Sequence, residues 1–317
     1  MIAEQQPIAN YVANDQHTPI IGRYAPSPTG VQHLGNIRTA VLAWLSARLQ
    51  GGQFIVRMED LDTPRTVAGS ADQILRDLEW LGLDWDGPVE YQSQRSEFYQ
   101  AALENLDSQG LVYPCFCSRK DIQTALSAPH RSQAVYPGTC CALSKSEIEK
   151  QAQQKSAAIR VRVDGQIIEF HDRCLGPQKQ NLRVEVGDFV IKRADGLFAY
   201  QLAVMVDDIA QGVSEVIRGA DLLGSTARQI YLAKKLANKC LIPQYCHVPL
   251  MVDSDGRRMA KRDGSHSISS WIENGKSAEQ LLASLVYGLG MLESDQPMSP
   301  GDMLDAISIE KFHASLS

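Results

Sequence analysis

Near the start of the chain, apolar residues change from strand-like runs to helical spacing and back. The short run Ile20–Ile21 is followed by apolar positions that recur every three or four residues. These positions are Ile37, Ala40, Val41, Trp44, Leu45 and Leu49. A second apolar run at 53–58 holds β-branched residues and predicts a buried strand parallel to the first. Strand, helix and strand form a βαβ unit, which predicts an α/β fold on a parallel sheet.

The same patterns predict further helices and strands along the chain. A helix at 68–81 ends before Gly82, and a second one through Phe98 and Leu106 ends at Gly110. The spacing from Ser277 to Gln280 is that of a capping box, which starts another helix. Strands are also predicted at 157–163, 213–218 and 248–252, and helices at 227–239 and 301–313.

Composition changes at residue 111 and divides the chain. From there to residue 185 cysteines and prolines become more frequent and helical spacing is lost, which predicts an inserted subdomain. The polar N-terminal stretch predicts a poorly ordered tail. The expected divisions are a tail at 1–19, a first half of the catalytic domain at 20–110, the insertion at 111–185, a second half at 186–264 and a C-terminal helical segment at 265–317.

Overall composition excludes two classes of protein. The 317 residues are 44% apolar and 21% charged, as is ordinary for a globular protein, and the net charge of −6 excludes a generally basic nucleic-acid coat. No stretch has the length of a membrane span, and the N-terminus lacks a secretory pattern. Seven cysteines without such a pattern favour a reducing, cytoplasmic location, where clustered thiols bind metal more often than they pair.

The stretch from Arg23 to Asn36 joins the first predicted strand to the first helix. Two prolines make this loop rigid, and two glycines let its backbone approach a ligand closely. The helix start offers free N–H groups and the positive end of the helix dipole, which suit a phosphate, and His33 adds a side-chain donor. The loop therefore predicts an anion site, although a structural turn is the alternative that holds for most such loops.

Charged side chains follow two of the predicted strands. Glu59 lies closest to the end of the 53–58 strand, where ligands gather in open parallel sheets, while Asp62 is expected to face solvent. Four basic residues within 257–262 follow a later strand. A mobile cation there would neutralise charge on a leaving pyrophosphate, although such runs usually form a solvated face.

Tyr200 and Arg218 are both predicted on strands that flank the core. Tyr200 falls in an expected hairpin, whose strands at 188–193 and 197–203 are joined by a primed turn at Asp195–Gly196. An arginine at a buried strand end needs an anionic partner, and an acidic substrate is one candidate. An internal salt bridge is equally consistent with the spacing, its candidates being Asp207, Asp208 and Asp221.

Three cysteines of the insertion have the chemistry of a metal site. Cys115, Cys117 and Cys140 are able to supply three ligands of a tetrahedral Zn²⁺ ion. Buried free thiols are the alternative and have about even odds on the count alone. The candidates for a fourth ligand are Tyr136, Cys141, His130 and water.

These motifs together resemble the catalytic domain of class I aminoacyl-tRNA synthetases of the glutamyl type. Four segments carry the resemblance in the family's order, from residue 21 to residue 264, which makes chance similarity very improbable. They are Arg23–Gly30 with His33–Asn36 (entry to the HIGH motif), Arg57–Asp62 (R-x-E-D-x-D), Val216–Asp221 (V-I-R-G-x-D) and Arg258–Arg262 (the KMSKS position).

The resemblance implies a Rossmann-type parallel sheet and a division of roles among the residues. Glu59 is expected to take the ammonium group of L-glutamate, and Arg23 and Arg218 to lie near its carboxylates. ATP, with Mg²⁺, is expected near His33 and the following helix, and Lys261 near the leaving pyrophosphate. The implied glutamate-binding set is Arg23, Ala25, Ser27, Glu59, Tyr200 and Arg218; the ATP-binding set is His33, Gly35, Asn36 and Lys261, of which His33 and Lys261 are the catalytic pair.

Length favours one branch of that family. Only 56 residues follow Lys261, whereas a full glutamyl-tRNA synthetase continues into a large anticodon-binding region. The chain is thus similar to the glutamyl-Q tRNA(Asp) synthetases, which attach glutamate to the queuosine in the anticodon loop of tRNA(Asp). That group carries a C-x-C…Y-x-x-x-C zinc site in its acceptor-like insertion, which implies one Zn²⁺ held by Cys115, Cys117, Tyr136 and Cys140. A monomer without membrane contact is expected.

The sequence departs from the family motifs at three positions. Asn36 replaces the second histidine of HIGH, Arg258 the first lysine of KMSKS and Ala260 its serine. Three other functions remain open: a synthetase that charges the tRNA 3′ end, a catalytically silent paralogue that binds tRNA or a protein, and a nucleotidyltransferase acting on a small molecule. The intact Arg23, Glu59, Arg218 and Lys261 argue against a silent paralogue.

Overall fold

A computed structural model describes residues 19–118, 120–122, 135–237, 242–251 and 267–316. Its centre is a seven-stranded sheet in the order β3-β2-β1-β9-β10-β6-β7. All neighbours in it pair in parallel except β7, which runs antiparallel to β6 at one edge. This confirms the predicted α/β fold with a mostly parallel sheet. The strands are β1 (Ile21–Tyr24), β2 (Gln53–Met58), β3 (Glu90–Tyr91), β6 (Ile167–Asp172), β7 (Gly176–Asn181), β9 (Glu215–Gly219) and β10 (Gln244–Val248).

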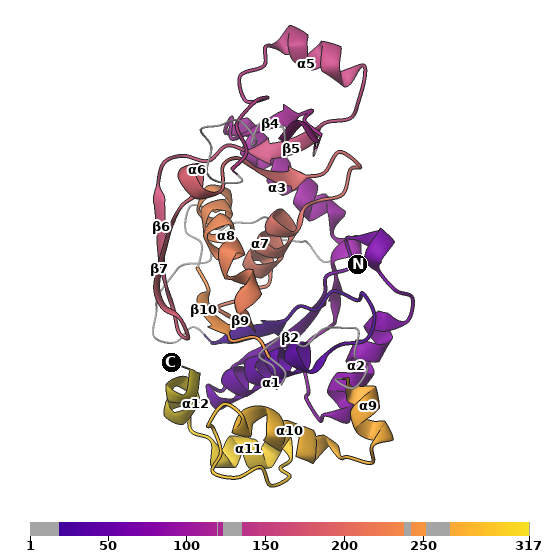
Figure 1. Cartoon of the computed structure of the whole chain (residues 1–317), viewed down its shortest axis with the longest axis vertical. Coiled ribbons are helices and arrows are strands. Elements are labelled where there is room, and N and C mark those ends of the chain that lie inside the picture. Colours follow the sequence, from indigo (N-terminus) through magenta and orange to yellow (C-terminus); the bar gives the residue numbers. More distant parts are fainter. Residues whose placement is uncertain (1–18, 119, 123–134, 238–241, 252–266, 317) are drawn as a thin grey trace, which may run out of the picture.

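Helices cover both faces of this sheet (Figure 1). Helix α1 (Leu34–Leu49) is buried almost all round, because it packs on the sheet and also against the C-terminal helices. The helices on its side of the sheet are α2 (Ser70–Trp80), α9 (Ile268–Glu273), α10 (Ala278–Tyr287), α11 (Pro300–Ala306) and α12 (Ile309–Leu316). The other face carries α3 (Ser96–Ser108), α7 (Tyr200–Ala210) and α8 (Leu223–Leu236). The described chain also contains the short 3₁₀ turns η1 (Thr63–Arg65), η2 (Gln92–Gln94) and η3 (Ala220–Leu222). Each face thus has its own apolar core.

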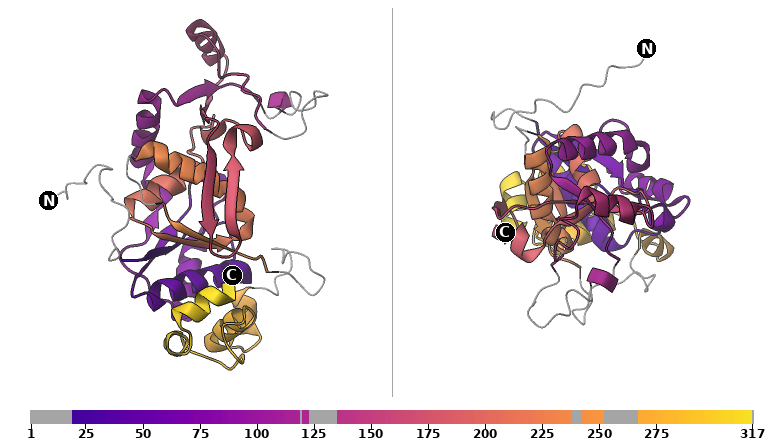
Figure 2. Two further views of the ribbon diagram at one scale, coloured as in Figure 1. Left: turned by 90° about the vertical axis from the view of Figure 1, so that its left-hand side faces the viewer. Right: turned by 90° about the horizontal axis from the view of Figure 1, so that it is seen from above.

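The predicted insertion contributes to two different sheets. Strands β4 (Val112–Cys115) and β5 (Ala158–Val161) form a small antiparallel sheet with β8 (Phe189–Lys192), at the end of the molecule that carries α5 (Lys145–Ala152). Its hairpin β6–β7 instead extends the main sheet along one side and leads into α6, Leu182–Glu185 (Figure 2). The division at residues 111 and 185 stays a prediction.

Three predicted elements differ from the structure. The strand at 197–203 is wrong: Phe198 makes a single bridge to Lys192, and α7 begins at Tyr200 because its apolar side chains pack against α3 and α8. The strand predicted at 248–252 is also wrong over its described residues, 248–251, since β10 pairs with β9 over 244–248 and ends before Pro249, which has no N–H to donate. The helix expected at 301–313 is two helices, α11 and α12.

One cysteine pair was not predicted. Cys174, in the turn between β6 and β7, forms a disulfide with Cys246 of β10.

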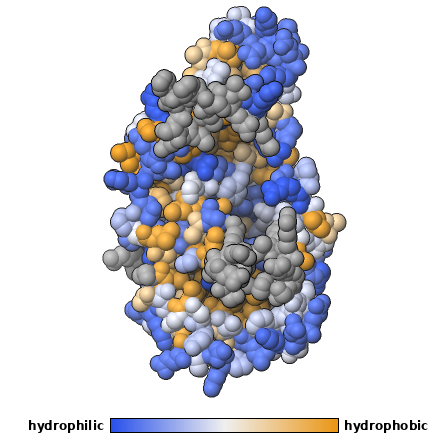
Figure 3. All heavy atoms as spheres, in the orientation of Figure 1, coloured by the Kyte–Doolittle hydropathy of each residue, from blue (hydrophilic) through white to orange (hydrophobic). Residues whose placement is uncertain are grey.

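Among the described residues no helix has the length and apolar character needed to cross a membrane. Hydrophilic side chains cover the α5 end of the molecule, whereas apolar side chains gather nearer its middle on the face drawn in Figure 3.

Candidate functional site

A cavity of about 570 Å³ opens at the carboxyl ends of the central strands. Loops that follow β1, β2, β9 and β10 contribute to its lining, as expected for an open parallel sheet. The cavity collects every predicted substrate residue that the structure describes. These are Arg23, Ala25, Ser27, His33, Gly35, Asn36, Glu59, Tyr200 and Arg218. The basic segment with Lys261, and with it Arg258 and Ala260, lies outside the described residues.

Hydrogen bonds hold the loop between β1 and α1 against the segment after β2. The backbone N–H of Glu59 donates to the Pro26 carbonyl (2.9 Å), and that of Val67 donates to Pro28 (2.9 Å). The Ser70 hydroxyl donates to the Gly30 carbonyl (2.9 Å) and accepts from the Gly30 N–H (3.2 Å). Gly30 has φ +115°, which only glycine adopts readily. Four hydrogen bonds thus fix the loop at three residues before it enters α1.

The first turn of α1 faces the cavity. His33 is the N-cap, and its side chain makes no capping bond, so the ring is not used to satisfy the helix end. A Cβ on Gly35 would lie 3.2 Å from the His33 ring, so glycine lets the imidazole lie close to the backbone. The Asn36 amide donates to Gln32 (2.6 Å). The N–H groups of Asn36 and Ile37 donate to the His33 carbonyl (2.9 and 3.3 Å), so the first turn presents to the cavity mainly the positive end of the helix dipole, which favours an anion.

Arg218 projects from the buried strand β9, with 4% of its surface exposed. Its Nε donates to His247 Nε2 (3.0 Å) and its Nη2 to Thr226 Oγ1 (2.9 Å). A longer contact of 3.4 Å joins Nη1 to the hydroxyl of Tyr200, the first residue of α7 rather than a strand residue. Within the described chain Arg218 makes no ion pair with Asp207 or Asp208.

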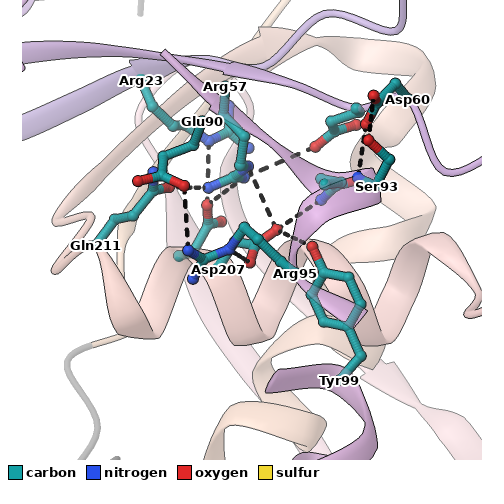
Figure 4. Close-up of polar contacts among 12 residues, drawn as sticks. Arg23, Arg57, Asp60, Glu90, Ser93, Arg95, Tyr99, Asp207 and Gln211 are labelled. Atoms are coloured by element: carbon teal, nitrogen blue, oxygen red, sulfur yellow. Dashed lines mark hydrogen bonds and ion pairs between the residues drawn. The ribbon is translucent and has the colours of Figure 1, made fainter. Parts of the chain in front are cut away.

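Those two aspartates instead belong to a buried network around Arg57 (Figure 4). Arg57 is fully buried. Its Nη2 lies 2.6 Å from Asp208 Oδ1, and its Nε lies 3.8 Å from Asp207 Oδ2. Arg23 Nε lies 3.5 Å from the same Asp208 oxygen. Asp207 also accepts hydrogen bonds from Gln92 (2.8 Å), Arg95 (2.7 Å) and Tyr99 (2.8 Å). Asp208 thereby links the guanidinium of Arg23, which lines the cavity, to this buried network.

Glu59 is the acidic group of the cavity. Its side chain is 8% exposed, and its Oε1 lies 3.7 Å from Arg57 Nη2. This oxygen makes no hydrogen bond to any described residue. Burial raises the pKa of Glu59 to about 7, although Arg57 and Arg23 oppose this shift. A buried carboxylate oxygen without a donor is costly on its own and is ready for a cationic ligand.

The raised pKa of Glu59 makes stability depend on pH. Between pH 4.5 and about 7 the folded protein holds a proton on this group that the unfolded chain has lost. The contribution of Glu59 to the unfolding free energy therefore falls by up to about 3 kcal/mol as pH rises through this range. We expect Glu59→Gln, which has no proton to lose, to gain stability relative to wild type between pH 5 and 8 in urea unfolding. Parallel profiles of the two proteins would contradict this.

The three predicted thiols meet beside the small sheet. The sulfur atoms of Cys115, Cys117 and Cys140 lie within 4.8 Å of one another, and Cys141 is outside this group. The Tyr136 hydroxyl lies 3.3 Å from Cys115 Sγ and 3.6 Å from Cys117 Sγ. Among the candidate fourth ligands, His130 lies outside the described residues.

The surroundings of these thiols fit a metal ion. Three sulfurs and one phenol oxygen at these separations are close to the edges of a tetrahedron with Zn–S bonds of about 2.3 Å. Backbone N–H groups donate to Cys140 Sγ (from Phe116, 3.4 Å) and to the Tyr136 oxygen (from Cys140, 3.1 Å). Arg160 donates to Cys115 Sγ (3.2 Å) and stacks 3.7 Å over the Tyr136 ring. Such outer contacts orient the four groups toward a common point.

Several residues of the cavity region were not predicted. Asp208 pairs with both Arg57 and Arg23, whereas it was expected only as a partner of Arg218, and His247, which accepts from Arg218, was not singled out at all. Arg38 also lines the cavity from α1 and donates to the Pro249 carbonyl. For Arg57, a charged residue inside the predicted buried strand at 53–58 was the available signal; His247 lies one residue before the strand predicted at 248–252 and offered none.

Comparison with known proteins agrees with this geometry. The family model "tRNA synthetases class I (E and Q), catalytic domain" matches residues 19–301. A protein named glutamyl-Q tRNA(Asp) synthetase from Nocardia farcinica is 48% identical over 92% of this chain and 91% of its own length. A protein of the same name from Geobacter sulfurreducens is 48% identical over 88% of this chain and 87% of its own length.

A solved structure is similar throughout the described fold. The glutamate tRNA ligase from Elizabethkingia meningosepticum, in complex with its amino acid, matches with a TM-score of 0.80 at 27% identity. The match covers 93% of this chain and 66% of that chain, so this chain spans just under two thirds of that protein.

Proposed function

This chain belongs to the catalytic-domain family of class I tRNA synthetases of the E and Q type, and we propose that it activates L-glutamate with ATP and transfers the glutamate to queuosine in tRNA(Asp). Relatives 41–48% identical over about nine tenths of the chain carry the name glutamyl-Q tRNA(Asp) synthetase. The choice of tRNA(Asp) and queuosine as acceptor rests on those names, whereas the choice of amino acid also rests on the cavity.

One observation carries the choice of amino acid. Two buried guanidinium groups, Arg23 and Arg218, and one buried carboxylate, Glu59, line the same cavity. Glutamate offers the complementary set of two carboxylates and one ammonium group. In the proposed pose Glu59 accepts from the ammonium, the two arginines face the carboxylates, and Tyr200, Ala25 and Ser27 complete the walls.

ATP is proposed to bind beside the amino acid, over the first turn of α1. His33, the N–H group of Gly35 and the side chain of Asn36 would contact its phosphates, since helix N-termini favour anions. Lys261 is proposed to neutralise the leaving pyrophosphate, and Mg²⁺ to accompany ATP.

The reaction needs no protein nucleophile. An oxygen of the glutamate α-carboxylate attacks the α-phosphorus of ATP, and the bond to pyrophosphate breaks, which gives glutamyl-adenylate. A hydroxyl of queuosine then attacks the carbonyl carbon; an ester forms, and AMP and a proton leave. The side chains act by holding the carboxylate in line with the phosphorus and by stabilising negative charge on the phosphates.

Zinc is proposed as a structural ion. Cys115, Cys117, Tyr136 and Cys140 would hold it, and when bound it would cross-link the end of β4 to the segment at 136–140. This position is in the small sheet rather than in the cavity lining, so the proposed chemistry does not use it.

Adenylate formation tests the amino-acid choice. Purified protein with ATP and hydroxylamine should give glutamyl-hydroxamate, and glutamine should react at least ~10²-fold less well, because it leaves one buried guanidinium without an anion. Equal use of glutamine, or no reaction with glutamate in the presence of tRNA(Asp), would refute the proposal.

A further inference from the structure

Behind Arg218 lies a chain of polar contacts to two residues that do not line the cavity. The Nε of Arg218 contacts His247 Nε2 at 3.0 Å, and His247 Nδ1 lies 2.5 Å from Asp172 Oδ2. His247 and Asp172 both have 0% exposure, and neither lines the cavity. Three strands that neighbour one another in the sheet, β9, β10 and β6, supply the three residues. The chain therefore connects the hairpin β6–β7 to the cavity wall.

The direction of these contacts follows from what each group is able to donate. Arginine has only donors, so His247 Nε2 accepts from Arg218; Thr226 Oγ1, which accepts from Arg218 Nη2, lies 3.1 Å from the same nitrogen. The imidazole proton must then lie on Nδ1, where it donates to the Asp172 carboxylate. A cationic or Nε2-protonated imidazole would instead direct a hydrogen at the guanidinium.

Asp172 is itself fixed. Its Oδ1 accepts from the backbone N–H groups of Cys174 (3.0 Å), Leu175 (3.0 Å) and His247 (3.1 Å), which leaves Oδ2 for the imidazole. Burial lowers the pKa of His247 below its usual range, although Asp172 opposes this, so the ring is neutral at neutral pH. The remaining charged groups that act on this ring are Arg218 and Arg23, and the Tyr245 ring stacks on it at 6.0 Å.

We propose that His247 and Asp172 are positioning residues that set the tautomer of the imidazole and thereby hold the Arg218 guanidinium toward the substrate carboxylate. Arg218 Nε and Nη2 are taken up by buried partners, and Nη1 has only the 3.4 Å contact to Tyr200 among the described residues. We call the contacts from Arg218 through His247 to Asp172 the positioning relay. This relay leaves Nη1 as the nitrogen available to an anion in the cavity. This inference rests on the proposed function for the identity of that anion.

Substitutions at the two positions separate this role from a packing role. In Asp172→Asn the amide oxygen keeps the three backbone bonds, so the NH₂ group faces Nδ1 and forces the proton onto Nε2, against Arg218. His247→Leu removes the acceptor, whereas His247→Gln keeps an acceptor for Arg218 and a donor for Asp172. We expect the KM for glutamate to rise about tenfold or more in Asp172→Asn and His247→Leu and less than about threefold in His247→Gln, with the KM for ATP unchanged.

A spectroscopic measurement keeps the test independent of activity. In ¹⁵N-histidine-labelled protein at pH 7, the His247 resonances, assigned by their loss in His247→Gln, should show a proton on Nδ1 in wild type and on Nε2 in Asp172→Asn. A wild-type Nε2–H tautomer, or equal rises in glutamate KM for His247→Gln and His247→Leu, would overturn the relay. If wild type fails to activate glutamate but shows the Nδ1–H tautomer, the proposed function fails and the relay stands.

Discussion

Arg218→Gln should lower kcat/KM for glutamate activation by roughly 10²–10³-fold, which corresponds to about 3–4 kcal/mol. The arginine is 4% exposed and held by buried partners, so a substrate carboxylate opposite it would lose a preoriented cation in a site with little water. Glutamine keeps hydrogen-bond donors to His247 and Thr226, which preserves packing. The loss should therefore appear in the KM for glutamate, with the melting temperature within a few degrees of wild type.

Arg76→Gln is the matched control. Arg76 is an exposed arginine on α2, and its described hydrogen bond goes to Gln73 on the same helix. Its substitution should leave glutamate activation unchanged. If Arg218→Gln retained wild-type kcat/KM while both variants remained folded, the assignment of Arg218 to the substrate carboxylate would be wrong.

Cys117→Ser should abolish zinc binding and destabilise the small sheet. The apolar cluster around the thiols is small, since its buried members in the part of the chain that the structure describes are Tyr113, Cys115, Phe116, Tyr136 and Cys140. Clusters of this size rarely hold a fold, and structural zinc contributes on the order of 10 kcal/mol in small metal domains. We expect wild type to contain one zinc per chain by atomic emission and Cys117→Ser to contain almost none, with an earlier melting step.

Two further variants identify the ligand set. Cys141→Ser should retain one zinc per chain, because this sulfur lies outside the thiol group. Tyr136→Phe removes the phenol oxygen alone and should weaken zinc binding in competition with a chelator. Zinc absent from wild type, or zinc content that is unaffected by Cys117→Ser, would contradict the site.

Residues close together in sequence were the predictable part of the cavity. The β1–loop–α1–β2 segment brings Arg23, His33 and Glu59 together through local patterns alone: an apolar strand, a Pro- and Gly-containing loop, and helical spacing. Only the family resemblance placed Arg218 beside them. In the structure all four residues line one cavity, at the carboxyl edge that parallel strands share.

The supporting residues depend on contacts that no local pattern encodes. Asp172 meets His247 across 75 positions, and Arg57 meets Asp208 across 151. The start of α7 at Tyr200 is set by packing against α3 and α8, which outweighed the hairpin pattern that predicted a strand at 197–203. The Asp–Gly turn was correctly located, but the segment after it pairs at one bridge only.

The most direct test of the account is transfer of labelled glutamate to tRNA(Asp) that carries or lacks queuosine, each with and without the 3′-terminal adenosine. The account predicts labelling of queuosine-containing tRNA(Asp), whether or not the terminal adenosine is present, and no labelling of tRNA that lacks queuosine. Labelling that requires the terminal adenosine, or that is equal without queuosine, would contradict it.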